Sequence, residues 1–139
     1  MIIPLDIAPT KESARGYAED AVRNMKSVYN VFLDYSLASL AHVDRVIREW
    51  RDGGAALEAV TKSLFAFGSY AGEVMRNQEP ARWTEPPRAD HGSMEDLFLY
   101  VKLMDGREWR PFPIVFQALT EGPQFSLEQS AKQLLAPAH

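Results

Sequence analysis

The sequence predicts an α+β domain, a helical bundle of about five helices with a small antiparallel β-hairpin sheet. Apolar residues recur at helical spacing over three long segments in the first half of the chain. An alternating apolar run then ends in Asp105-Gly106, a strong hairpin signal, and two shorter helical segments follow. Helices grouped before and after one hairpin are typical of an α+β domain. The length of 139 residues suits a single domain, residues 1–139.

The first half is predicted to contain three helices after a flexible N-terminal segment, residues 1–9. The first helix covers about residues 10–28, and its apolar positions are Tyr17, Ala21, Met25 and Val28. After a break near residues 30–35, Ser36 offers an N-terminal cap to a second helix that ends at Gly53-Gly54. The outer face of this second helix is densely charged, with His42, Arg45, Arg48, Glu49 and Asp52.

The third helix, about residues 55–77, is apolar nearly all round and is predicted to be central. Gly68 and Gly72 lie four residues apart within it, although a mid-helix glycine costs about 1 kcal/mol relative to alanine. This pair predicts a flat face that another backbone approaches closely. Glu73 follows on the same helix and needs a partner if it is partly buried; Arg76, Tyr70 or a backbone amide are the candidates. We therefore assign structural roles to Gly68, Tyr70, Gly72, Glu73 and Arg76.

The second half is predicted to contain a long surface loop, a hairpin and two helices. The loop covers residues 79–96, and the hairpin pairs Leu97 to Met104 with Arg107 to Arg110. Pro113 is expected to open the next helix, which Gly122-Pro123 closes. A capping box, Ser126 to Gln129, starts the last helix, and the tail 136–139 is expected to be frayed.

Composition argues against several classes of function. The net charge is −4, whereas nucleic-acid binders normally carry a basic face, so no nucleic-acid partner is expected. The chain has no cysteine, and its histidines, His42, His91 and His139, lack metal-binding spacing, so neither a metal nor another cofactor is expected. Ser69 lies within a predicted helix rather than at the strained turn that a nucleophile needs, and no catalytic residue is assigned. The start of the sequence has no signal-peptide pattern or spanning helix, so we expect a cytoplasmic protein without membrane contact.

The predicted loop has the composition of a recognition surface, because Trp and Arg dominate interface hot spots. The candidate partner-binding residues are Glu79, Arg82, Trp83, Glu85, Asp90, Glu95 and Asp96. An alternative is that Trp83 folds back and caps the core. Trp109 in the hairpin also has two interpretations: it belongs to a binding site, or it lies over Lys102 in a cation–π contact.

Several short motifs resemble a group of small bacterial domains of unknown function. The motifs are Leu33-Asp34-Tyr35-Ser36, Ser39-Leu40, the segment Tyr70-Ala71-Gly72-Glu73-Val74 with Arg76, and then Trp83. The resemblance covers most of residues 30–85 and, more weakly, the hairpin and the stretch from Phe112 to Gly122. This sequence departs from the group before the tryptophan, where Asn77 to Arg82 replace the paired glycines of the relatives.

Members of such groups are often encoded beside secreted toxins, and some resemble immunity proteins. The resemblance therefore implies a non-enzymatic cytoplasmic protein that binds and neutralises a bacterial secreted toxin domain, for example one delivered by type VI secretion. The alternative is an effector chaperone or adaptor of a secretion system, with Phe112, Ile114, Val115 and Phe116 lining an apolar groove. A third hypothesis is a small enzyme that uses Glu73 with Arg76 or His91.

Overall fold

The computed structural model describes residues 3–86 and 97–137. Within these residues the helices are α1 (Ala14–Tyr29), α2 (Leu40–Asp52), α3 (Leu57–Gln78), α4 (Pro111–Thr120) and α5 (Leu127–Leu135). Two short 3-10 turns, η1 (Leu5–Ile7) and η2 (Leu37–Ser39), precede α1 and α2, and the strands are β1 (Ala81–Thr84), β2 (Tyr100–Leu103) and β3 (Glu108–Trp109). The predicted α+β class, with five helices and a small antiparallel sheet, is confirmed.

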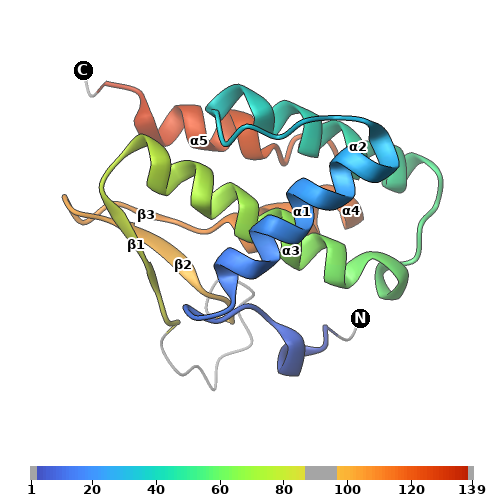
Figure 1. Ribbon diagram of the computed structural model, residues 1–139, viewed down its shortest axis with the longest axis horizontal. Coiled ribbons are helices and arrows are strands. Elements are labelled where there is room, and N and C mark those ends of the chain that lie inside the picture. Colours follow the sequence, from blue (N-terminus) through green and yellow to red (C-terminus); the bar gives the residue numbers. More distant parts are fainter. Residues whose placement is uncertain (1–2, 87–96, 138–139) are drawn as a thin grey trace.

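Helix α3 is the centre of the fold, as its nearly continuous apolar sequence predicts. It packs against α1 and α4, while α2 packs against α4 and α5. Figure 1 shows α1 crossing in front of α3, with α2 and α5 along the top and the sheet at the left. The core is rich in aromatic rings: Phe65 lies within 6.4 Å, centroid to centroid, of Phe98, Phe112 and Phe116. Burial of these rings removes a large apolar area from water.

The sheet has one strand more than the hairpin that the sequence predicts. Strand β1 pairs antiparallel with β2, and β2 with β3, so the order is β1-β2-β3. Trp83, Val101 and Trp109 are aligned across the sheet and buried, whereas their neighbours Arg82, Lys102 and Glu108 are aligned on the other side. The expected surface loop over 79–96 is therefore wrong for Ala81–Thr84, which is a strand because Trp83 joins the buried row; residues 87–96 lie outside the described part.

The glycine pair on α3 permits a close approach, as predicted, but of aromatic rings rather than of a backbone. A Cβ added at Gly68 would overlap the Phe112 ring, and one at Gly72 would overlap the Trp83 ring. The close approach thus admits two bulky side chains to the surface of the central helix. These two rings give a packing reason for glycine in mid-helix despite its cost.

Other expectations need smaller corrections. Val28 is 68% exposed, and the buried face of α1 is Ala14, Ala18, Ala21 and Met25. Helix α4 begins at Pro111 rather than Pro113, since a proline fits the first helical position. Trp109 donates from Nε1 to Ser130 Oγ (2.9 Å) and is not stacked on Lys102; the ring contact on this sheet is Arg110 over Tyr100, 4.4 Å from the centroid.

Candidate functional site

Glu73 is bound into the fold by its neighbours. One carboxylate oxygen, Oε2, accepts hydrogen bonds from Arg76 Nη1 (2.8 Å) and Trp83 Nε1 (2.7 Å), and the Glu73 side chain is 15% exposed. Arg76 also donates from Nε to the Ala81 carbonyl (3.4 Å), so it joins α3 to β1. The predicted pairing of Glu73 with Arg76 is confirmed. Trp83 is a second partner that the sequence alone did not indicate.

Trp83 is therefore not the exposed centre of a recognition loop. Its side chain is 7% exposed, packs on Gly72 and lies 6.0 Å, centroid to centroid, from Phe112. The expectation of an exposed Trp83 is wrong, and the alternative, in which it caps the core, is correct. Of the other candidate partner-binding residues, Glu79, Arg82 and Glu85 lie at the surface, whereas Asp90, Glu95 and Asp96 lie outside the described residues.

Tyr70 connects the two halves of the resemblance motif. Its hydroxyl lies 2.6 Å from Ser39 Oγ and accepts a hydrogen bond from the Tyr35 backbone amide (2.8 Å). Tyr35 has a left-handed backbone conformation, with φ of 62°. Burial raises the pKa of Tyr70 to about 12, so the hydroxyl is neutral at physiological pH. These bonds join the segment before α2 to the central helix, as expected for a structural role.

The groove expected of an effector chaperone is not formed by the residues assigned to it. Phe112, Val115 and Phe116 are fully buried in the core, because α4 packs between α2 and α3. Of the residues proposed for that groove, only Ile114 reaches the surface in part. The chaperone hypothesis therefore loses the apolar groove on which it was based.

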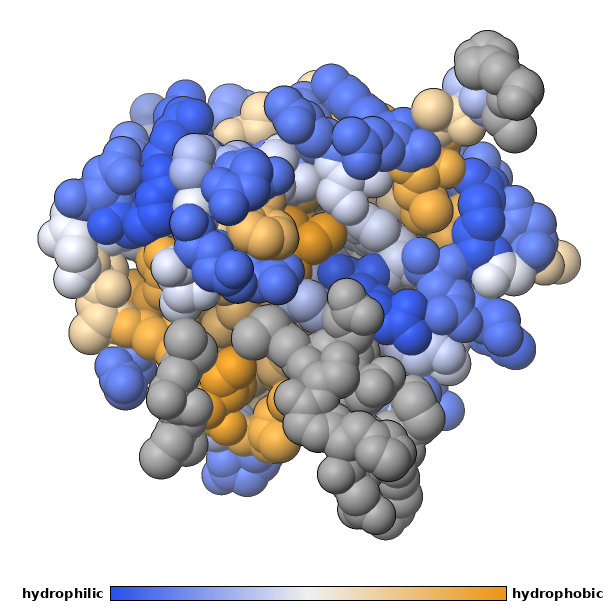
Figure 2. Space-filling view, turned by 180° about the vertical axis from the view of Figure 1, so that it is seen from behind, coloured by the Kyte–Doolittle hydropathy of each residue, from blue (hydrophilic) through white to orange (hydrophobic). Residues whose placement is uncertain are grey.

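A different apolar surface lies where α1 ends. Val28 and Phe32 are 68% and 72% exposed, and Val28 lines a shallow groove of about 270 Å³ between α1, α2 and α3. Trp50 lines this groove, stacks on Phe67 at 5.5 Å and donates from Nε1 to the Tyr29 hydroxyl (3.0 Å). Seen from behind, the molecule has mainly hydrophilic residues over its upper half and hydrophobic surface in its centre and lower part (Figure 2). We name Val28, Tyr29, Phe32 and Trp50 the α1 apolar patch.

A polar concave site lies between α2 and α5. It encloses about 240 Å³, and we name it the α2–α5 pocket. Its lining residues include Asp44, Arg45, Arg48, Arg51, Ala118, Ser126, Glu128 and Gln129. The charged outer face of the second helix, predicted from sequence, thus forms one wall of a pocket.

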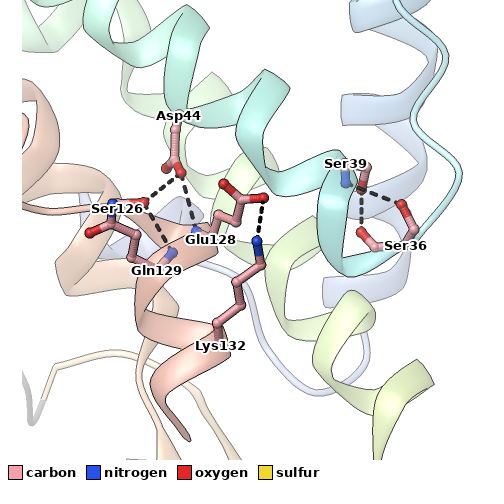
Figure 3. Close-up of polar contacts among 7 residues, drawn as sticks. All are labelled: Ser36, Ser39, Asp44, Ser126, Glu128, Gln129 and Lys132. Atoms are coloured by element: carbon pink, nitrogen blue, oxygen red, sulfur yellow. Dashed lines mark hydrogen bonds and ion pairs between the residues drawn. The ribbon is translucent and has the colours of Figure 1, made fainter. Parts of the chain in front are cut away.

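Asp44 joins the two walls of this pocket. Its carboxylate accepts hydrogen bonds from Ser126 Oγ (2.8 Å) and from the amides of Leu127 (2.8 Å) and Glu128 (3.1 Å). The Ser126 hydroxyl in turn accepts from the Gln129 amide (3.1 Å) (Figure 3). The half of the predicted capping box in which Ser126 accepts from Gln129 is therefore confirmed. Asp44 of α2 accepts from two further amides of the first turn, those of Leu127 and Glu128. Burial raises the pKa of Asp44 above its usual value, although these hydrogen bonds oppose the rise.

Three arginines supply the positive charge of the pocket, and they differ in their bonding. Arg51 donates to the Ala118 carbonyl (3.2 Å) and to Asp52 (3.2 Å), so it is fixed at the C-terminal part of α4. Arg45 has one long contact, 3.4 Å, with His42 Nδ1. Both Arg45 and Arg48 are exposed, and neither forms an ion pair with any carboxylate in residues 3–86 or 97–137.

Both carboxylates that line the pocket already have partners within the fold. Glu128 pairs with Lys132 at 3.1 Å, and Asp44 caps α5. Arg45 and Arg48 are three residues apart on α2, so their side chains project from the same face. The pocket therefore has two guanidinium groups with unused donors. The spacing of Arg45, Arg48 and Arg51 was visible in the sequence, but their meeting with α5 was not.

Comparisons with known proteins do not assign a function to the chain, so the functional assignment rests on the geometry of the site. No family model, curated protein or solved structure matches the chain. Among the described residues, no helix is both long and apolar enough to cross a membrane. The same residues contain no cluster of three potential metal ligands among His, Cys, Asp and Glu.

Proposed function

We propose that this chain is a non-enzymatic immunity protein that binds and neutralises a bacterial secreted toxin domain in the cytoplasm. The observation that carries the proposal is the α2–α5 pocket, where Arg45 and Arg48 have no carboxylate partner among the described residues. Arginine is enriched in protein interfaces, because its planar guanidinium group binds carboxylates with two parallel hydrogen bonds. A rigid site of this kind serves binding and needs no reacting group.

The bonding of Glu73 supports the same assignment. An acid–base catalyst needs to reach substrate, whereas Glu73 Oε2 is engaged by Arg76 and Trp83, and the side chain is 15% exposed. Together with Tyr70, the residues of the resemblance motif hold α3 to the sheet and to the segment before α2. The motif residues thus serve the scaffold, and the charged outer face of α2 is left for partner recognition.

Neutralisation in bacterial cells tests the proposal. The genes on either side are searched for a secreted toxin domain, which is then produced in the cytoplasm with this chain or with an empty vector. We expect growth only with the chain, and a complex of equal stoichiometry in size-exclusion chromatography. Cells that die equally in both cases would refute the immunity assignment.

The α1 apolar patch favours one second candidate, an effector chaperone or adaptor. Val28 and Phe32 expose apolar surface of the kind that holds a client segment. Under this alternative, the effector stays active when bound, and Phe32→Asp abolishes binding. Loss of toxin activity on binding, with normal binding by Phe32→Asp, would decide for the immunity protein.

A further inference from the structure

We infer that the α2–α5 pocket receives an acidic segment of the partner protein, whose Asp or Glu carboxylates bind Arg45 and Arg48. This inference rests on the proposed function, since it names the chemistry of the partner at the same site.

The local charge of the pocket is opposite to that of the molecule. The chain carries a net charge of −4, yet Arg45, Arg48 and Arg51 lie together on one face of α2. Asp44 and Glu128, the carboxylates that line the pocket, are held by the first turn of α5 and by Lys132. Only Arg51 of the three arginines has a carboxylate partner among the described residues. The remaining positive charge favours an anionic occupant.

The pocket is also rigid enough to orient such an occupant. Asp44 ties α2 to α5 through three hydrogen bonds, and Arg51 ties α2 to α4 through the Ala118 carbonyl. The wall that carries Arg45 and Arg48 is therefore fixed by helices on both sides. Two guanidinium groups one helical turn apart match two carboxylates of a short acidic segment.

An acidic protein segment fits the site better than a nucleic acid does. Nucleic-acid binding relies on an extended basic surface that follows the phosphate backbone. The enclosed space here is about 240 Å³, the size of one or two side chains, and the rest of the chain carries net negative charge. A carboxylate inserted from a partner needs only the local positive charge.

Binding of a model peptide tests the site on the isolated chain. Hexaglutamate is titrated into the protein at low salt, and hexaglutamine is the neutral control. We expect shifts in the NMR signals of the Arg45 and Arg48 side chains, and about tenfold weaker binding for Arg45→Glu/Arg48→Glu. Lys62→Glu/Lys26→Glu makes the same change in net charge on α3 and α1 and is expected to bind the peptide within about twofold of the parent. Equal binding by the two double variants, or tighter binding of inorganic phosphate than of the peptide, would overturn the inference.

Neutralisation assays separate this inference from the proposed function. With the neighbouring toxin domain, Arg45→Glu/Arg48→Glu is expected to lose protection, whereas Lys62→Glu/Lys26→Glu retains it. If the parent protects and both double variants protect equally, the acidic-segment inference is wrong while the immunity function stands. If the parent does not protect but hexaglutamate binds at Arg45 and Arg48, the function is wrong and the acidic-ligand site stands.

Discussion

At the scale of single residues, Gly72 controls how closely Trp83 approaches the central helix. The indole ring occupies the space that a Cβ would take, and its Nε1 then reaches Glu73. We predict that Gly72→Ala lowers the free energy of unfolding by about 1–3 kcal/mol, because the ring must move in a packed core. Urea denaturation followed by tryptophan fluorescence measures this loss.

Gly16 provides the matched control for this substitution. No described atom lies within 4 Å of a Cβ built there, and the residue lies on α1. Gly16→Ala is expected to raise the free energy of unfolding by about 0.5 kcal/mol, since alanine favours the helix. If Gly72→Ala were as stable as Gly16→Ala, the contact with Trp83 would not determine the choice of glycine.

Glu73 is the second residue whose role can be separated by substitution. Glu73→Ala leaves Trp83 Nε1 without its acceptor and is expected to cost about 2 kcal/mol, as lost hydrogen bonds to charged groups do. Glu73→Gln keeps an acceptor for the indole but loses the ion pair with Arg76, so its cost is expected to be smaller. Thermal unfolding of both variants checks the order. Full stability together with lost toxin neutralisation would assign Glu73 to binding instead.

At the scale of elements, the position of α5 depends on a cap supplied by α2. We predict that Asp44→Ala lowers the free energy of unfolding by about 1–2 kcal/mol, because the amides of Leu127 and Glu128 lose their acceptor. Hydrogen exchange of these two amides is expected to accelerate most. The control is Asp52→Ala, at a side chain that is 67% exposed and pairs with Arg51, with an expected change under about 0.5 kcal/mol. Unchanged exchange in Asp44→Ala would show that the cap is dispensable.

The helices were predictable because each repeats its apolar residues at helical spacing over several turns. Strand β1 was not predictable in this way, because it has four residues, alternates only once and is surrounded by prolines and charges. Its assignment depends on pairing with β2, about twenty residues later, which no local pattern encodes. The prediction that Trp83 is an exposed recognition residue was wrong for the same reason. It was based on local composition, whereas the contact with Gly72 that buries Trp83 comes from another element.

At the scale of the whole molecule, α3 holds the other elements together through its aromatic and hydroxyl contacts. One part of α3 receives Phe112 and Trp83 at the glycines, and another binds the segment before α2 through Tyr70. The polar groups of these contacts are used within the fold. The charged outer face of α2 and the α1 apolar patch are two described surfaces with unused donors or exposed apolar area. Partner recognition is therefore expected to vary without loss of the scaffold.

Alkaline unfolding tests whether Tyr70 holds this scaffold together. Burial raises its pKa to about 12, compared with 10.0 for an ordinary tyrosine, so the folded state resists loss of the hydroxyl proton. Its contribution to stability is therefore fully present below pH 10 and is lost as the pH rises through 12. A difference of about 2 pKa units corresponds to about 2.7 kcal/mol in the free energy of unfolding. Burial also raises the pKa of Tyr17 and of Tyr35, so these residues add to the loss of stability at high pH.

Urea denaturation of the parent, Tyr70→Phe and Tyr29→Phe at a series of pH values from 8 to 12 measures this dependence. Tyr70→Phe is expected to be less stable than the parent at pH 8, because Ser39 and the Tyr35 amide lose their partner. Its stability should then fall less steeply above pH 10, since one of the titrating groups is gone. Tyr29→Phe, at a partly exposed tyrosine of α1, should fall as steeply as the parent. If Tyr70→Phe and the parent fell in parallel, the buried hydroxyl would not couple folding to pH, and the link between the segment before α2 and α3 would depend on ring packing alone.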